Sequence, residues 1–144
     1  MGYYRDRTQR GNRILKKMGR DGLMLNQKDV CPDLYDMSVG HLFGDVWARP
    51  HLSLRDRQLV TLAANIAMAR TTGNHSHYHS AMQLGITQKQ IIEIIIHVGH
   101  YAGWPTIGLA MRQFNKVLKV AAAQKKAGKT KRGRALAEAW EQND

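Results

Sequence analysis

The sequence has 144 residues, and 43% of them are hydrophobic, which suits one folded domain with a single core. No apolar run approaches the ~20 residues of a membrane-spanning helix, and the first ten residues contain no apolar leader stretch. We therefore expect a cytoplasmic protein that does not associate with a membrane. The single cysteine, Cys31, excludes an internal disulfide and a cysteine-based zinc ribbon.

The net charge of +11 is concentrated toward the two ends of the sequence. Residues 1–20 hold seven basic residues and one acidic residue, and residues 94–137 hold nine basic residues and no acidic one. Such a field could bind nucleic acid or attract anionic substrates. No aromatic residues are interleaved with the C-terminal charges, so we interpret residues 121–144 as a solvated basic extension of a domain formed by residues 1–120, and we do not expect nucleic acid binding.

Helical periodicity runs through the sequence, and no period-two alternation predicts a strand, so we expect an all-α, single-domain bundle of about six or seven helices. The predicted helices cover residues 4–18, 32–47, 54–70, 75–84 and 88–101 and a segment from 105, and a basic helix could follow 132. The apolar contacts expected for the second helix are Leu34, Leu42, Phe43, Val46 and Trp47.

Several turn residues mark the predicted helix ends. Ser53 is a favourable N-cap for the third helix, and Gly85 is a typical C-terminal stop for the fourth. The sequence from Thr87 to Gln90 has the form of a capping box, and Pro105 suits the first turn of the sixth helix. The fifth helix contains the isoleucine-rich run 91–96, which must be covered on more than one side and so indicates a central helix or one shared with a second subunit.

Five histidines lie within 26 residues: His75, His77, His79, His97 and His100. His75 and His79 share one helical face, and His97 and His100 share another, and such pairs can chelate a transition metal. No acidic residue lies near positions 75–79 and there is no HExxH motif, so we do not expect these histidines to bind a metal. A metal site built from His75, His79, His97 and His100 remains the alternative.

Three arginines, Arg49, Arg55 and Arg57, cluster just before the third helix or at its start. The guanidinium fork matches a carboxylate, and a histidine beside such a group can stabilise an oxyanion or return a proton. The alternative interpretation is that these arginines form surface ion pairs with Asp45 or Asp56.

The segments FGDVWARP at 43–50, RDRQLVTLA at 55–63 and IIHVGHYAGWP at 95–105 resemble the carboxymuconolactone decarboxylase family. The pattern His77-x3-Ala81-x3-Gly85 between them and residues 11–14 resemble it as well, so the resemblance covers about residues 5–120. It implies the all-α fold of that family and a ring-shaped homotrimer or homohexamer.

The resemblance also implies a site near the start of the fourth helix, with His77 as the family histidine and with Arg57, Trp47 and Tyr101 lining it. The implied reaction is cofactor-free loss of carbon dioxide from γ-carboxymuconolactone or a related acidic lactone. We assign binding of the small-molecule carboxylate substrate to Arg57 or Arg49. His77, with His97 as the second choice, is the predicted proton donor or oxyanion stabiliser.

Two departures qualify the resemblance. Related peroxide-reducing proteins carry a CxxC motif, but the corresponding positions here are Arg70 and Gly73, so thiol-based peroxide reduction is not expected. Gly73 also replaces a glutamate that often lies four residues before the family histidine. A different substrate, a histidine-bound metal and a non-enzymatic basic binding protein are therefore the alternative hypotheses.

Overall fold

A computed structural model describes residues 2–126, and within that range the chain is helical and contains no strand, as predicted. The elements are α1 (Gly2–Lys17), the 3-10 turn η1 (Leu25–Gln27), α2 (Pro32–Tyr35), the π-helix η2 (Asp36–Val46), α3 (Leu54–Ala67), α4 (Asn74–Gln83), α5 (Gln88–Ala102) and α6 (Pro105–Lys126). Between residues 2 and 126, none of these helices combines the length and the apolar character needed to cross a bilayer.

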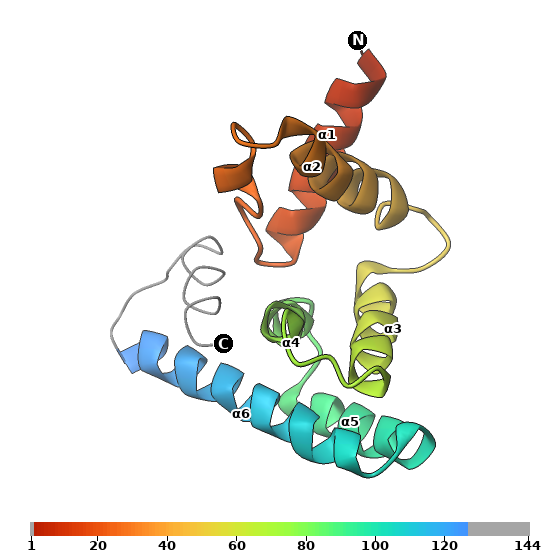
Figure 1. Ribbon diagram of the computed structural model, residues 1–144, viewed down its shortest axis with the longest axis vertical. Coiled ribbons are helices and arrows are strands. Elements are labelled where there is room, and N and C mark those ends of the chain that lie inside the picture. The colour runs from red at the N-terminus through yellow and green to blue at the C-terminus, as the bar shows by residue number, and fades with distance from the viewer. Residues whose placement is uncertain (1, 127–144) are drawn as a thin grey trace.

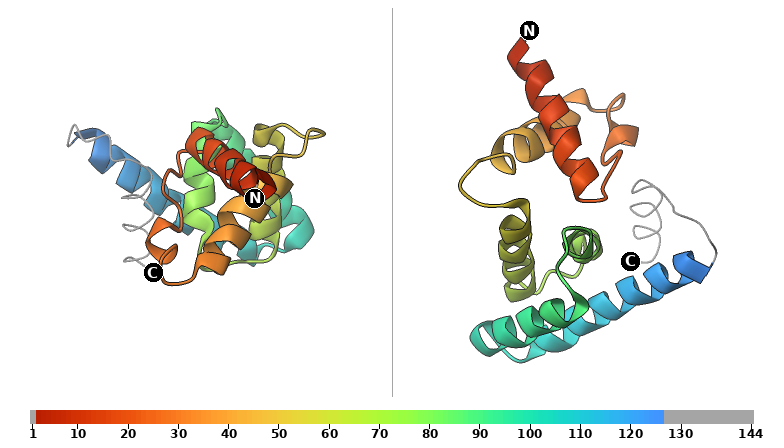
Figure 2. Two further views of the ribbon diagram at one scale, coloured as in Figure 1. Left: turned by 90° about the horizontal axis from the view of Figure 1, so that it is seen from above. Right: turned by 180° about the vertical axis from the view of Figure 1, so that it is seen from behind.

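The helices form two groups, one above the other in Figure 1 and in the right-hand view of Figure 2. The N-terminal lobe comprises residues 2–47, with α1 packed against η2. The C-terminal lobe comprises residues 54–126, in which α6 packs against α3, α4 and α5. A short connection between η2 and α3 joins the two lobes.

The core of the C-terminal lobe is apolar and is built from all four of its helices. At its centre the rings of Tyr78 and Phe114 lie 5.3 Å apart, and both side chains are fully buried. The other buried members are Leu62, Ile66, Ala81, Ile86, Ile91, Ile95, Ala110 and Val117. Each large apolar side chain removed from water contributes about 1.5–3 kcal/mol, so this cluster dominates the stability of the lobe.

The N-terminal lobe is held together by a close helix crossing. A Cβ atom at Gly11 would overlap the carbonyl oxygen of Val39, and one at Gly44 would overlap that of Arg7, so only glycine permits this approach. Ion pairs flank the crossing: Arg7 pairs with Asp36, and Arg10 lies 2.9 Å from Asp45.

The second predicted helix is helical throughout, but its buried face differs from the prediction. Leu34, Leu42 and Val46 are exposed, whereas the buried residues are Tyr35, Val39, Phe43 and Trp47. These four repeat every four residues. In an α-helix of 3.6 residues per turn such a row drifts around the axis, and the wider turns of the π-helix η2 reduce that drift and keep the row on one face.

The predicted helix ends are confirmed at four places. The side chain of Ser53 accepts a hydrogen bond from the Asp56 amide, Thr87 and Gln90 form a complete capping box, and α6 begins at Pro105. Gly85 follows α4 with a φ of 80°. The third helix was predicted to reach residue 70 but ends at Ala67, because Ala69 adopts a left-handed conformation with a φ of 49°.

The division of the chain at residue 120 stays a prediction. Helix α6 continues across it to Lys126, and the basic helix expected after 132 lies outside the described residues. The predicted covering of α5 on several sides is incomplete within the described chain, where Ile91 and Ile95 are buried but Ile92 and Ile96 are 36% and 42% exposed.

Candidate functional site

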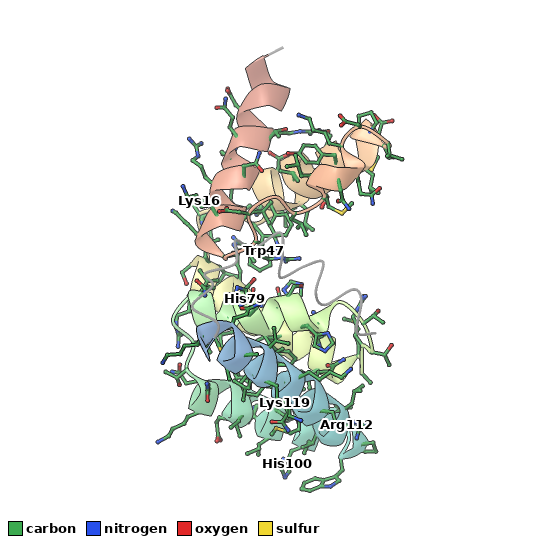
Figure 3. All side chains as sticks on the ribbon, turned by 90° about the vertical axis from the view of Figure 1, so that its left-hand side faces the viewer. Lys16, Trp47, His79, His100, Arg112 and Lys119 are labelled. Atoms are coloured by element: carbon green, nitrogen blue, oxygen red, sulfur yellow. The ribbon has the colours of Figure 1, made fainter. Side chains whose placement is uncertain are left out.

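His77, the residue that the resemblance assigns as the family histidine, lies on α4 near the N-terminal lobe. His77 is in the first turns of α4, and Leu54 and Leu84 of the C-terminal lobe pack against the apolar cluster of the N-terminal lobe. Figure 3 shows Trp47 and His79 at neighbouring heights, whereas His100 lies at the opposite end of the C-terminal lobe. The candidate site is therefore built from both lobes.

The ring of His77 is oriented by a buried glutamine. Gln58 is fully buried on α3, and its Nε2 lies 3.3 Å from Nδ1 of His77. An amide nitrogen can only donate, so Nδ1 accepts in this arrangement and the neutral ring carries its proton on Nε2. Gln58 thereby supplies an orienting partner for His77. In the family that role is expected of a glutamate at the position that Gly73 occupies here.

A shielded cation lies beside His77. The side chain of Arg20, three residues after α1, is only partly covered as a whole, but its Nε and Nη1 are out of contact with solvent and have no hydrogen-bond partner among the described residues. The guanidinium carbon lies 5.4 Å from the centre of the Phe43 ring, a cation–π distance. Burial lowers the pKa of Arg20 to about 10, so it stays charged at neutral pH.

His77 is neutral at pH 7. Burial, and secondarily the charge of Arg20, lower its pKa from 6.5 to about 4. The pKa of His79 is also lowered by burial and Arg20, although a hydrogen bond with the Gly19 backbone opposes the shift. The site therefore combines neutral imidazoles with one cation, a combination suited to an anionic ligand.

The start of α4 is fixed to α6 by buried amides. Nδ2 of Asn74 donates to Oε1 of Gln113 at 3.1 Å, and Nε2 of Gln113 lies 2.7 Å and 3.1 Å from the carbonyl oxygens of Arg70 and Thr71. Gly73 precedes the helix with a φ of 73°, and a Cβ there would meet nothing within 4 Å. The segment before His77 is thus held by the side-chain amides of Asn74 and Gln113, without a side chain at position 73.

Of the predicted binding residues, Trp47 is buried and its ring lies 5.8 Å from that of Phe43, on the N-terminal side of the site. Nη2 of Arg57 donates to the Arg49 carbonyl oxygen at 2.8 Å, whereas Arg49 is itself exposed. The structure gives neither arginine a contact with His77.

The alternative role of the three arginines as ion-pair partners of Asp45 or Asp56 is wrong for the described side chains. Asp45 instead contacts Arg7, Arg10 and His41, and Arg55 donates to Gln90 at 3.3 Å.

His97 and Tyr101 lie elsewhere. Their rings are 5.1 Å apart on α5, and Tyr101 is 84% exposed. His97 lines a groove of about 520 Å³ between α3 and α5, together with Arg55 and several apolar residues, and neither His77 nor Arg20 lines this groove. We place the candidate chemistry at His77 rather than in the groove, because the groove lacks the shielded cation and the oriented imidazole.

The candidate metal ligands are divided between two helices. His75 is buried and His79 partly buried on α4, whereas His97 and His100 are exposed on α5, and Nδ1 of His100 lies 2.8 Å from the Ile96 carbonyl oxygen. In the part of the chain that the structure describes, no three histidine, cysteine or acidic side chains are grouped so that they could hold a metal ion.

Two residues of the site, Gln58 and Arg20, had no predicted role. A signal existed for Gln58, since it shares a four-residue spacing with Leu62 and Ile66 and is thus a polar residue in an apolar stripe. Arg20 gave no comparable signal. It is the last of seven basic residues in positions 1–20, and it lies beyond the end of α1, where helical periodicity no longer indicates which side chains are buried.

The comparisons with known proteins agree with this fold. Residues 32–116 match the model of the carboxymuconolactone decarboxylase family. A 4-carboxymuconolactone decarboxylase from Acinetobacter baylyi is 32% identical over 94 residues, which are 65% of this chain and 70% of that protein. A nitrosuccinic acid decarboxylase from Metarhizium robertsii is 33% identical over 69 residues, 48% of each chain.

The fold and the site thus define an all-helical protein of a decarboxylase family. The chain belongs to the carboxymuconolactone decarboxylase family, and these relatives support a decarboxylase role.

Proposed function

We propose that the protein is a cofactor-free carboxy-lyase that acts on γ-carboxymuconolactone or a related acidic lactone. The observation that carries the proposal is the shielded, neutral His77, oriented by Gln58 and placed beside the cation of Arg20. The substrate class is inferred from the relative named as a 4-carboxymuconolactone decarboxylase.

The chemistry needs an electron sink and a proton. As the bond to the leaving carboxylate breaks, its electron pair enters the unsaturated lactone, carbon dioxide departs and negative charge develops on the carbonyl oxygen. Nε2–H of a neutral imidazole can donate a hydrogen bond to that oxygen without itself carrying charge. We assign this role to His77.

The same histidine can complete the reaction. A negative charge beside an imidazole raises its pKa, so in the dienolate complex His77 can take up a proton from water and pass it to the ring carbon. The products are carbon dioxide and an enol-lactone, and one proton is consumed. No step requires a metal or an organic cofactor.

The remaining predicted residues keep supporting roles in this proposal. Arg57 has a shielded Nε without a partner among the described residues, which suits contact with a carboxylate, and Arg49 is the second candidate. His97 and Tyr101 could line the site at His77 only if several copies of the chain assemble and a neighbouring copy supplies them. A homotrimer or homohexamer would cover the exposed Ile92 and Ile96 of α5.

The test is to generate γ-carboxymuconolactone in the presence of purified protein without added metal and to follow carbon dioxide and enol-lactone. Rapid turnover is the expected result. Failure of a folded protein to turn this lactone over would reject the substrate assignment.

A second substrate follows from the relative named as a nitrosuccinic acid decarboxylase. In such an acid the nitro group can accept the electron pair that the leaving carboxylate releases, so the same His77 geometry would serve. Nitrosuccinate in the same assay distinguishes the two substrates.

A further inference from the structure

We propose that Arg20 is the seat for a substrate carboxylate that is retained during the reaction, and that it holds this group beside His77 with His79 as a second polar neighbour. The ligand class is a small dicarboxylate, of which one group leaves and the other stays on Arg20. This assignment rests on the proposed decarboxylase function.

The first observation is that Arg20 lacks the partners its neighbours have. Arg7 and Arg10, on the helix just before it, pair with Asp36 and Asp45. In Arg20 both Nε and Nη1 are shielded from water, and among the described residues nothing accepts from them. A guanidinium with two unsatisfied, desolvated donors is costly to fold, and a carboxylate can accept a hydrogen bond from either of them.

The second observation is the position of the Arg20 guanidinium between the lobes. The face of the Phe43 ring lies 5.4 Å from the guanidinium carbon and fixes one side of the group. Gly19, with a φ of 68°, brings the chain so close to α4 that a Cβ there would lie 3.0 Å from Nε2 of His79. The glycine thus allows Arg20 to approach the histidines of α4.

The third observation separates Arg20 from the arginines expected to bind substrate. Arg57 already donates Nη2 to the Arg49 carbonyl oxygen, and Arg49 is exposed. Arg20, in contrast, is close enough to lower the pKa of both His77 and His79 by its charge. A carboxylate on Arg20 would therefore lie within electrostatic range of the imidazole that serves the reacting carbonyl.

The experiment uses succinate, a stable dicarboxylate, and follows the Arg20 Nε–H and the His77 ring by NMR during titration. We expect saturable binding, a shift of the Nε–H signal and a rise in the pKa of His77 as Arg20 is neutralised. In Arg20→Met the Kd for succinate should rise about ten- to a hundredfold, the effect of losing a charge-assisted hydrogen bond. Arg20→Lys should recover part of the affinity.

The matched control is Arg13→Met, which removes the same charge from an exposed position on α1. Its affinity for succinate should equal that of the wild type. A stability measurement adds a second readout, because removing an unpaired shielded cation should leave the melting temperature of Arg20→Met unchanged or raised. An arginine with a purely structural role would instead lower the melting temperature when replaced.

Absence of saturable succinate binding to the wild type, or equal binding by Arg20→Met, would overturn the proposal. Because this assay needs no turnover, it separates the two hypotheses. Succinate binding through Arg20 in a protein that decarboxylates neither candidate substrate would reject the proposed function alone. Decarboxylation with an unchanged KM in Arg20→Met would reject the seat alone.

Discussion

The two lobes reach stability by different means. In the C-terminal lobe, apolar side chains from four helices interlock around Tyr78 and Phe114, and most polar contacts are at helix ends. In the N-terminal lobe, α1 and η2 touch through their backbones at Gly11 and Gly44, and ion pairs flank that crossing. The C-terminal lobe is therefore held mainly by apolar packing, whereas the N-terminal lobe adds a close backbone crossing and ion pairs to its own apolar cluster.

This difference explains the composition of the site between them. The apolar lobe can hold a desolvated, neutral imidazole in a fixed orientation, because Gln58 and α4 are anchored in its core. The charged lobe supplies the cation, because its arginine-rich first helix ends just before Arg20. Neither lobe alone contains both groups.

The largest expected effect is the loss of activity when His77, the catalytic residue proposed in the C-terminal lobe, is replaced. Replacing His77 by alanine should lower kcat about a hundred- to ten-thousandfold, the usual range for a general acid or base, without unfolding the protein. Ser76→Ala, one residue earlier on α4, is the matched control, since the Ser76 hydroxyl donates to the Gly73 carbonyl at the helix start. Carbon dioxide release measures both, and full activity of His77→Ala would reject the assignment.

The next effect is a pH dependence of the free energy of unfolding that arises from His77, at the boundary between the lobes. Unfolded histidine takes up a proton below about pH 6.5, but folded His77 does so only near pH 4. Its contribution to stability is therefore fully present above pH 6.5 and is lost as the pH falls toward 4. The loss amounts to at most about 3 kcal/mol, at 1.36 kcal/mol per pKa unit.

Denaturant unfolding at about pH 7 and about pH 4.5 measures this loss. The free energy of unfolding of His77→Gln should fall less over that interval than the wild-type value, whereas His51→Gln, at an exposed loop position, should follow the wild type. Identical pH dependence of wild type and His77→Gln would contradict the shielding of His77.

A glycine substitution tests the packing of the N-terminal lobe. Gly44→Ala should destabilise the protein by about 2–3 kcal/mol, because its Cβ would overlap the Arg7 carbonyl oxygen. Gly108→Ala, at an exposed position of α6 with ordinary space around it, should instead stabilise by about 0.5–1 kcal/mol through helix propensity. Thermal melts followed by circular dichroism decide between them, and equal effects would show that the crossing is not tight.

The smallest expected effect is at a helix end of the C-terminal lobe. Thr87→Ala removes the N-cap of α5 and should cost about 1 kcal/mol. Thr72→Ala, in the exposed loop before α4, should change stability by less than about 0.5 kcal/mol. A loss at Thr87 as large as that at Gly44 would mean that the two lobes do not differ in how they are stabilised.

The sequence by itself determined the helical class and most helix ends. These features depend on local chemistry: apolar spacing sets the helices, and the side chains of Ser53, Thr87 and Gly85 act on their own backbone neighbours. The same local patterns were not sufficient for the second helix, in which the wide turns of η2 place Val39 and Phe43 inward and Leu42 outward.

Only the tertiary structure decided which polar residues meet. Arg20 and His77 are 57 positions apart and Gln58 lies on a third segment, so no spacing along the chain could bring them together in advance. His77 and His97 have similar sequence signals, yet one is shielded between the lobes and the other is exposed. Burial and the field of a distant charge, which separate these two histidines, exist only after the lobes have packed.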